Sequence, residues 1–255
     1  MKILAVQLDI AWEDREANFA KVERMIAEAR PEPNTLVVLP EMFATGFSMA
    51  PASVEPEDGP TDAFLARLAH QYDIALVGGA ALRIGEESFN CALTFGPYAT
   101  PWGTYRKQRP FVSGGEIYTP GKEPELIQME GWDLAPLPSF CPFICYDLRF
   151  PELFREAARR WKPEIYVVIA SWPLARAHHW VRLLQARAIE NQAYVLGVNR
   201  CGTDPYFSFP GRTMLVDWHG EILADAGSEE GTLTASLDLP ALRAYREQLR
   251  FLDDM

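Results

Sequence analysis

The chain has 255 residues, of which 48% are hydrophobic and 23% charged, so it can bury a large core without dividing into domains. Its formal net charge of -11 argues against nucleic acid or an anionic membrane as the main partner. No apolar run is long enough to span a bilayer, and residues 1–7 enter a strand pattern without the apolar core of a signal peptide. We therefore expect a cytoplasmic protein.

Strand and helix signals alternate along the chain. The first half predicts strands at 3–8, 36–39, 74–82, 89–95 and 100–105, with helices at 15–30 and 62–72. A loop rich in Gly, Ser and Pro is expected at 111–121. The second half predicts strands at 140–145, 165–170, 194–199, 212–216 and 232–237, and helices at 151–161, 178–192 and from 240 onward. Several strands are apolar throughout, which indicates an α/β protein with helix-covered sheets, and the absence of a linker predicts one domain over residues 1–255.

Three reactive side chains follow short β-like runs. Glu41 stands in Leu-Pro-Glu-Met-Phe at 39–43, Lys107 ends Tyr-Arg-Lys at 105–107, and Cys145 lies between an apolar stretch and a sharp break in the chain. Ligands of open α/β sheets bind beyond the C-terminal ends of the strands, where these side chains would meet. Taken singly, each also fits an ordinary role: a small buried hydrophobe for Cys145, a solvated loop residue or a helix cap for Glu41, and a solvent-facing side chain for Lys107.

Together these groups suit covalent attack on an amide or nitrile. A thiol is mostly protonated at neutral pH and needs a base or a nearby cation. Glu41 would take the thiol proton and later pass it to ammonia, and Lys107 would stabilise the oxyanion. The backbone N–H of Tyr146, directly after Cys145, would be a second oxyanion donor.

The histidines and the other cysteines fit poorly as bases for the thiol or as metal ligands. His70 falls on an expected helix and His219 in a turn, so neither is placed to serve the thiol. The pair His178 and His179 would form half of a metal site, but adjacent side chains on a helix diverge, which favours helix-start or packing roles. The cysteines, none in a pattern typical of zinc sites, are expected to be free thiols: Cys91, Cys141, Cys145 and Cys201. No metal or other cofactor is expected.

The segments at 39–43, 105–107 and 144–151 resemble, in sequence and order, the signatures of the nitrilase (carbon–nitrogen hydrolase) superfamily. The resemblance runs over nearly the whole chain. It implies a four-layer αββα sandwich, usually paired as a homodimer, with Glu41 as base, Lys107 as oxyanion partner and Cys145 as nucleophile. It also implies a second active-site glutamate at Glu116 in Gly-Gly-Glu, for which a solvated loop carboxylate is the alternative.

The segments at 45–49, 171–173 and 185–194 are similar to those of omega-amidases, particularly the bacterial type that acts on 2-oxoglutaramate. The expected activity is hydrolysis of the terminal amide of a small carboxylic acid, with release of ammonia from a cysteine thioester. Other amidases of the superfamily are the alternatives, acting on deaminated glutathione or on N-carbamoyl amino acids. A true nitrilase and a non-catalytic binding protein of the same fold are further rivals.

Substrate selection is expected to depend on the residues around the thiol. Arg149 sits where carboxylate-binding relatives carry an arginine, whose planar fork holds two oxygens at once. Its alternative role is an ion pair with Glu152 or Asp147. The run Gln-Arg-Pro at 108–110 departs from the family pattern after the lysine. The resemblance therefore does not determine which carboxylic acid the substrate carries. Aromatic side chains are predicted to wall the pocket, with ordinary core positions as the alternative: Phe43, Tyr146 and Trp172, with Phe111 a weaker candidate.

Overall fold

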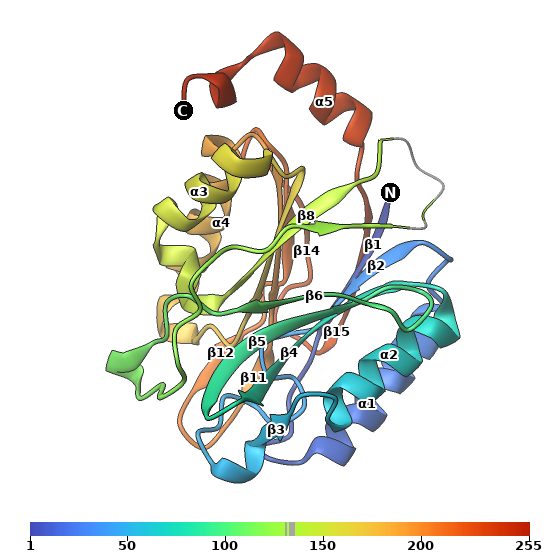
Figure 1. Ribbon diagram of the computed structural model, residues 1–255, viewed down its shortest axis with the longest axis vertical. Helices are drawn as coiled ribbons and strands as arrows, with labels where there is room; N and C mark the ends of the chain where they lie inside the picture. Colours follow the sequence, from blue (N-terminus) through green and yellow to red (C-terminus); the bar gives the residue numbers. More distant parts are fainter. Residues whose placement is uncertain (131, 133–135) are drawn as a thin grey trace.

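The computed structural model describes residues 1–130, 132 and 136–255, which form two β-sheets packed face to face (Figure 1). The first sheet has the strand order β15-β1-β2-β4-β5-β6, with β3 paired to β4. The central strands β1, β2 and β4 are parallel, and β15, β5 and β6 add antiparallel edges. The bounds are β1 Lys2–Gln7, β2 Thr35–Val38, β3 Val54–Pro56, β4 Ala75–Ile84, β5 Glu87–Phe95, β6 Pro101–Arg106 and β15 Gly231–Ser236.

The second sheet has the order β14-β13-β10-β9-β8-β7 and a parallel centre made of β8, β9 and β10. Its bounds are β7 Ile127–Gln128, β8 Ser139–Ile144, β9 Ile165–Ala170, β10 Tyr194–Asn199, β13 Met214–Val216 and β14 Ile222–Asp225. A separate hairpin of β11 (Cys201–Thr203) and β12 (Ser208–Pro210) follows β10. Strands β9 and β10 are buried along their whole length, as their continuous apolar sequence predicts.

Helices cover the outer face of each sheet. In Figure 1, α1 (Arg15–Ala29) and α2 (Pro60–Tyr72) lie on one side, and α3 (Pro151–Trp161) and α4 (Ala177–Glu190) on the other. Apolar side chains of α1 and α2 pack on the first sheet in one core cluster, and those of α3 and α4 on the second sheet in another. The arrangement is therefore a four-layer αββα sandwich, as expected. Helix α5 (Leu239–Gln248) follows the last strand.

Most expected elements are present, with shifted ends. Helix α1 stops one residue early because Arg30 adopts a left-handed conformation (φ 49°) and its N–H caps Ile26. Helix α2 begins at Pro60, two residues before the expected start, because a proline suits the first helical position and the carboxylate of Glu55 accepts the N–H of Thr61 (2.8 Å). The predicted loop at 111–121 contains only the short turn η2 (Val112–Gly114). The strands not predicted are β3, β7, β11, β12 and β14.

The C-terminal ends of several strands converge where the two sheets meet. Glu41 follows β2, Lys107 follows β6, and Cys145 follows β8 directly. Ser171 follows β9 directly. Strands β2 and β6 belong to the first sheet and β8 and β9 to the second, so the face-to-face packing of the sheets creates the site.

Candidate active site

Cys145 is held on a strained turn beside a cavity. It follows β8 and begins the 3₁₀ turn η3 (Cys145–Arg149), with a left-handed φ of 45° that a non-glycine residue seldom adopts. The side chain lines a cavity of about 330 Å³, and the other three cysteines are buried away from it. The thiol thus has the accessible strand-end position that the sequence predicts.

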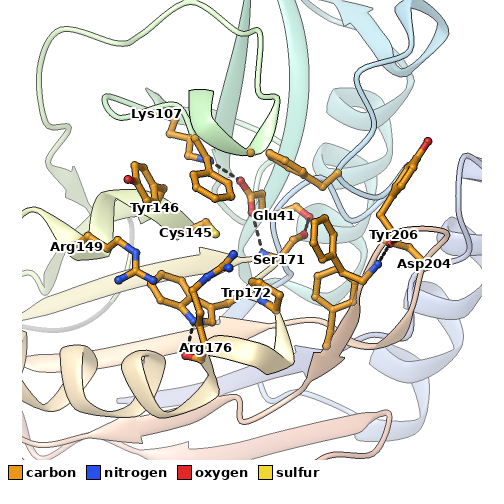
Figure 2. Close-up of a pocket in the computed structure, with 16 residues that line it drawn as sticks. Glu41, Lys107, Cys145, Tyr146, Arg149, Ser171, Trp172, Arg176, Asp204 and Tyr206 are labelled. Carbon is orange, nitrogen blue, oxygen red and sulfur yellow. Dashed lines mark hydrogen bonds and ion pairs between the residues drawn. The ribbon is translucent and has the colours of Figure 1, made fainter.

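Glu41 is fully buried and takes part in a dense set of hydrogen bonds. Its Oε1 accepts bonds from Lys107 Nζ (3.0 Å) and Asn90 Nδ2 (2.8 Å), and its Oε2 accepts the backbone N–H of Ser171 (2.8 Å). Figure 2 shows the carboxylate next to Cys145, with dashed lines to the lysine and to Ser171. These contacts fix both carboxylate oxygens, so the side chain cannot rotate freely.

Lys107 and Glu116 complete this buried cluster. The ammonium of Lys107 bonds Glu116 Oε2 at 2.8 Å as well as Glu41, and Glu116 Oε2 also accepts the N–H of Phe111. Burial favours the neutral amine, but the two carboxylates outweigh it and raise the pKa of Lys107 above its usual value. Lys107 is therefore a permanent cation. Glu116 is buried beside the lysine rather than solvated.

Asn90, on β5, is a member of the cluster that the sequence analysis missed. Its Nδ2 donates to Glu41 Oε1 (2.8 Å) and to Glu116 Oε1 (3.0 Å), so one neutral amide bridges the two carboxylates. The signal in the sequence is an amide between two apolar residues of a predicted strand, Phe89 and Cys91. A buried polar residue at such a position needs partners, and here the partners are two carboxylates.

The surroundings keep the Cys145 thiol protonated. Burial is the main cause that raises its pKa well above the usual value, and the negative charge of Glu41 raises it further. Lys107 and the backbone of Ser171 act in the opposite direction but are outweighed. A neutral thiol must lose its proton as it attacks. The fixed carboxylate of Glu41 next to it is suited to remove that proton as a general base.

Two arginines lie on the wall of the same cavity. Arg149 ends η3, and Arg176 ends the short turn η4 (Leu174–Arg176). The Arg149 guanidinium lies over the ring of Trp172, 4.7 Å from its centroid, and Trp172 Nε1 donates to the Arg176 carbonyl (2.8 Å). In the described part of the chain neither arginine forms an ion pair with a carboxylate, so Arg149 pairs with neither Glu152 nor Asp147.

The environment of Arg149 makes it receptive to an anion. Burial, and after it the charge of Arg176, lower the pKa of Arg149. Its polar contact is His179 Nδ1, 3.3 Å from Nη2. His178 and His179 lie in the first turn of α4, as expected, and no group of three or more His, Cys, Asp or Glu in residues 1–130, 132 and 136–255 is arranged to hold a metal ion. A carboxylate placed between the two arginines would relieve their mutual repulsion.

Aromatic side chains form most of the remaining wall. Tyr146, Trp172 and Phe111 line the cavity, as the sequence suggested. The expectation for Phe43 is wrong: this ring is fully buried among Phe19 and Phe64 in the core between the first sheet and its helices. Phe43 lies in the turn after β2, where its ring packs against Phe19 of α1 and Phe64 of α2. Lining residues that the sequence analysis missed include Phe47, Arg176, Tyr206, Phe207 and Phe209.

Asp147 connects the turn that carries Cys145 to the segment that carries Lys107. Its buried carboxylate accepts bonds from Tyr105 Oη (2.8 Å), the N–H of Ile144 (3.0 Å) and the N–H of Arg109 (2.8 Å). Tyr105 is on β6 and Arg109 follows Lys107, whereas Ile144 precedes Cys145. One carboxylate therefore sets the spacing between the nucleophile and the lysine.

Comparison with known proteins agrees with this geometry. The family model described as carbon-nitrogen hydrolase matches residues 2–247. The chain belongs to the carbon–nitrogen hydrolase family. It is 35% identical to the omega-amidase YafV of Yersinia enterocolitica, over 100% of this chain and 96% of that protein. It is 32% identical to the 2-oxoglutaramate amidase of Bacillus subtilis, over 99% and 96%.

A solved structure of the carbon–nitrogen hydrolase superfamily is also similar. XC1258 from Xanthomonas campestris, which has an arsenic adduct in its active site, superposes with a TM-score of 0.92 at 31% identity, covering 100% of this chain and 97% of that one. This carbon–nitrogen hydrolase is thus an amidohydrolase that acts on carbon–nitrogen bonds other than peptide bonds. In its described residues, no helix combines the length and hydropathy needed to cross a membrane.

Proposed function

We propose that this hydrolase cleaves the terminal amide of a small carboxylic acid of the 2-oxoglutaramate type. The observation that carries the proposal is the position of Arg149 and Arg176 on the wall of the cavity that contains Cys145. Two guanidiniums without a carboxylate partner among the described residues suit the free carboxylate of such a substrate. The names of the relatives, omega-amidase and 2-oxoglutaramate amidase, support the same substrate class.

The first half of the mechanism forms a thioester. Glu41 removes the proton of Cys145 as the sulfur attacks the amide carbon, which the neutral state of the thiol requires. The ammonium of Lys107 and the N–H of Tyr146 stabilise the oxyanion, because donors fixed in a buried site act without reorganisation. Ammonia leaves with a proton from Glu41. In the second half, Glu41 activates a water molecule that releases the acid. Glu116 fixes the position of Lys107 relative to Glu41, because the Lys107 ammonium bonds both carboxylates.

The test is ammonia release from a panel of amides. We expect 2-oxoglutaramate to have a higher kcat/KM than deaminated glutathione, N-carbamoyl amino acids or a simple nitrile. Equal or better turnover of one of these rivals would reject the substrate assignment. Absence of ammonia together with absence of an acyl adduct at Cys145 in intact-mass spectra, with Cys145→Ala as control, would favour a non-catalytic protein.

Arginine variants test the carboxylate contact directly. Because charge-assisted bonds to a carboxylate contribute about 1.5–3 kcal/mol each, Arg149→Met should raise KM for 2-oxoglutaramate about 10- to 100-fold. The effect on a neutral amide of the same length should be several-fold smaller. Equal losses for both amides would show that Arg149 supports the fold rather than the carboxylate.

We also propose that the chain is a single catalytic domain, acts in the cytoplasm and forms a homodimer. Its cysteines are free thiols in the structure, which suits a reducing compartment. Exposed apolar side chains on α4 and β14, including Ile189, Ile222 and Leu223, offer a surface for a second copy. Light scattering of the purified protein should give twice the mass of the chain, and a monomeric mass at micromolar concentration would reject the dimer.

A further inference from the structure

The turn between β11 and β12 places exposed aromatic rings at the mouth of the cavity. Tyr206 is 72% exposed and Phe207 47% exposed, yet both line the cavity that contains Cys145. Large aromatic side chains that remain in water beside a concave site favour an apolar ligand group, because covering them removes apolar surface from water. The reaction proposed above, with ammonia as the leaving group, leaves this surface uncovered.

The turn is rigid despite its exposure. The Asp204 carboxylate accepts the N–H groups of Tyr206 and Phe207 (both 2.8 Å), and the N–H of Asp204 donates to the Phe207 carbonyl (2.9 Å). The buried Arg200 side chain also ties this hairpin to the N-terminal part of the chain, because it donates to the carbonyls of Thr203 (3.2 Å) and Ile10 (3.1 Å). The backbone that carries the rings is therefore fixed before any ligand binds, which lowers the entropic cost of binding one.

The position of the turn relative to Cys145 shows which part of a bound amide substrate the turn faces. In Figure 2, Arg149 lies on one side of Cys145, whereas Glu41 and, further away, Tyr206 lie on the other. An acyl group whose carboxylate reaches Arg149 has its amide nitrogen on the Glu41 side, where the leaving group receives its proton. Phe47 lines the same cavity, with Lys107 Nζ 5.3 Å from its ring centroid. A substituent on the amide nitrogen would thus extend toward Phe47 and the aromatic turn.

We propose that Phe47, Tyr206 and Phe207 form a subsite for an apolar substituent on the leaving nitrogen, so that the enzyme also hydrolyses N-substituted terminal amides of small acids. The inference rests on the function proposed above. The Cys145 sulfur bonds to the carbonyl carbon, the carbon–nitrogen bond breaks, and the nitrogen takes the former thiol proton from Glu41 to leave as a neutral primary amine. Water then cleaves the thioester to give the same acid as the primary amide does.

The test compares glutaramic acid with N-benzylglutaramic acid, both followed by chromatography of the glutarate released. We expect wild-type enzyme to hydrolyse both. In Phe207→Ala and in Tyr206→Ala, the ratio of kcat/KM for the benzyl amide to that for the primary amide should fall about tenfold, as expected for losing one aromatic contact with the benzyl ring. Tyr98→Ala removes an equally exposed ring (74% exposed) in the turn between β5 and β6 and should leave the ratio unchanged.

The possible outcomes separate this inference from the function on which it rests. Hydrolysis of glutaramic acid without hydrolysis of its benzyl amide, or a ratio that is the same in wild type and both turn variants, would overturn the subsite. If neither amide is hydrolysed, the proposed function fails, and dissociation constants measured by calorimetry on Cys145→Ala decide the subsite. On that protein the benzyl amide should bind about tenfold more tightly than the primary amide, and equal affinity would overturn the proposal.

Discussion

At the residue scale, the reactivity of Cys145 depends on a carboxylate that makes the thiol harder to ionise. Burial raises the pKa of Cys145 most and the charge of Glu41 raises it further, while the position of Glu41 suits it to take the proton during attack. The site therefore differs from one that stores a thiolate beside a cation. Catalysis in such a site requires the base and the nucleophile to act in the same step.

Glu41→Gln should separate the effect of Glu41 on the pKa of Cys145 from its role as the general base. The neutral amide removes the charge that raises the pKa of Cys145, so alkylation by iodoacetamide should extend to lower pH than in wild type. Amide turnover should nevertheless fall by about 10²- to 10⁴-fold, the usual contribution of a general base. Alkylation rates measured by mass spectrometry from pH 6 to 10 check the first part. Wild-type turnover in a folded Glu41→Gln protein would reject Glu41 as the base.

Asn90 helps to hold two buried carboxylates in fixed positions, since its amide donates to both. Asn90→Ala removes a donor from both Glu41 and Glu116, so kcat should fall about tenfold as the base loses its orientation. Asn191→Ala, which removes another buried amide bonded to the Arg187 carbonyl, is the matched control and should leave kcat unchanged. A wild-type kcat in Asn90→Ala would count against the bridging role.

At the element scale, the site depends on how closely β4 approaches the turn that carries Glu41. A methyl group on Gly79 would lie 2.5 Å from the Met42 nitrogen and 2.7 Å from the Glu41 Cα, which no real structure tolerates. The N–H of Gly79 also donates to the Pro40 carbonyl (3.2 Å). Glycine is needed here because the neighbouring backbone occupies the space of a side chain.

Gly79→Ala should therefore displace Glu41 from the thiol. A shift of about 1 Å in a catalytic group costs about 10²-fold in rate, so kcat should fall by that order. Gly231→Ala on β15, where an added methyl meets nothing within 4 Å, provides the control and should retain activity. Thermal melts of both variants distinguish local displacement from unfolding. Wild-type kcat in a folded Gly79→Ala protein would refute the close-approach argument.

At the scale of the whole molecule, one buried carboxylate bonds residues of both sheets. Asp147 accepts bonds from Tyr105 on β6 of the first sheet and from Ile144 on β8 of the second. Burial is the main cause that raises the pKa of Asp147 to about 7, and Lys107 together with the three donors only partly offsets it. This group is thus a source of pH-dependent stability.

The sign of that dependence follows from the raised pKa. Because the folded state binds the proton more tightly than the unfolded chain, the stabilisation is complete below about pH 3.8 and is lost as pH rises through about 7. Asp147→Asn removes this dependence, so the free energy of unfolding of wild type relative to the variant should fall by about 2–3 kcal/mol between pH 5 and pH 8. Urea unfolding at the two pH values measures it. A constant difference would show that Asp147 does not titrate in this range.

Much of the architecture followed from local patterns. The apolar runs of β9 and β10 are so strongly hydrophobic that both faces must be buried, and the break after Cys145 marked the end of β8. Short or edge strands such as β3, β7 and β14 were missed because their few residues carry no periodic signal. That the chain forms one domain and pairs with a second copy are still predictions.

The sequence by itself determined the chemistry: a thiol, a carboxylate and a lysine at strand ends, in the order typical of one family. Only the tertiary structure decided which further side chains join them. Asn90 reaches both glutamates, Arg176 joins Arg149, and Phe43 turns into the core because the packing of two sheets and their helices sets the direction of each side chain. Local sequence fixes which strand a residue follows, but contacts between residues far apart in the chain fix what that residue faces.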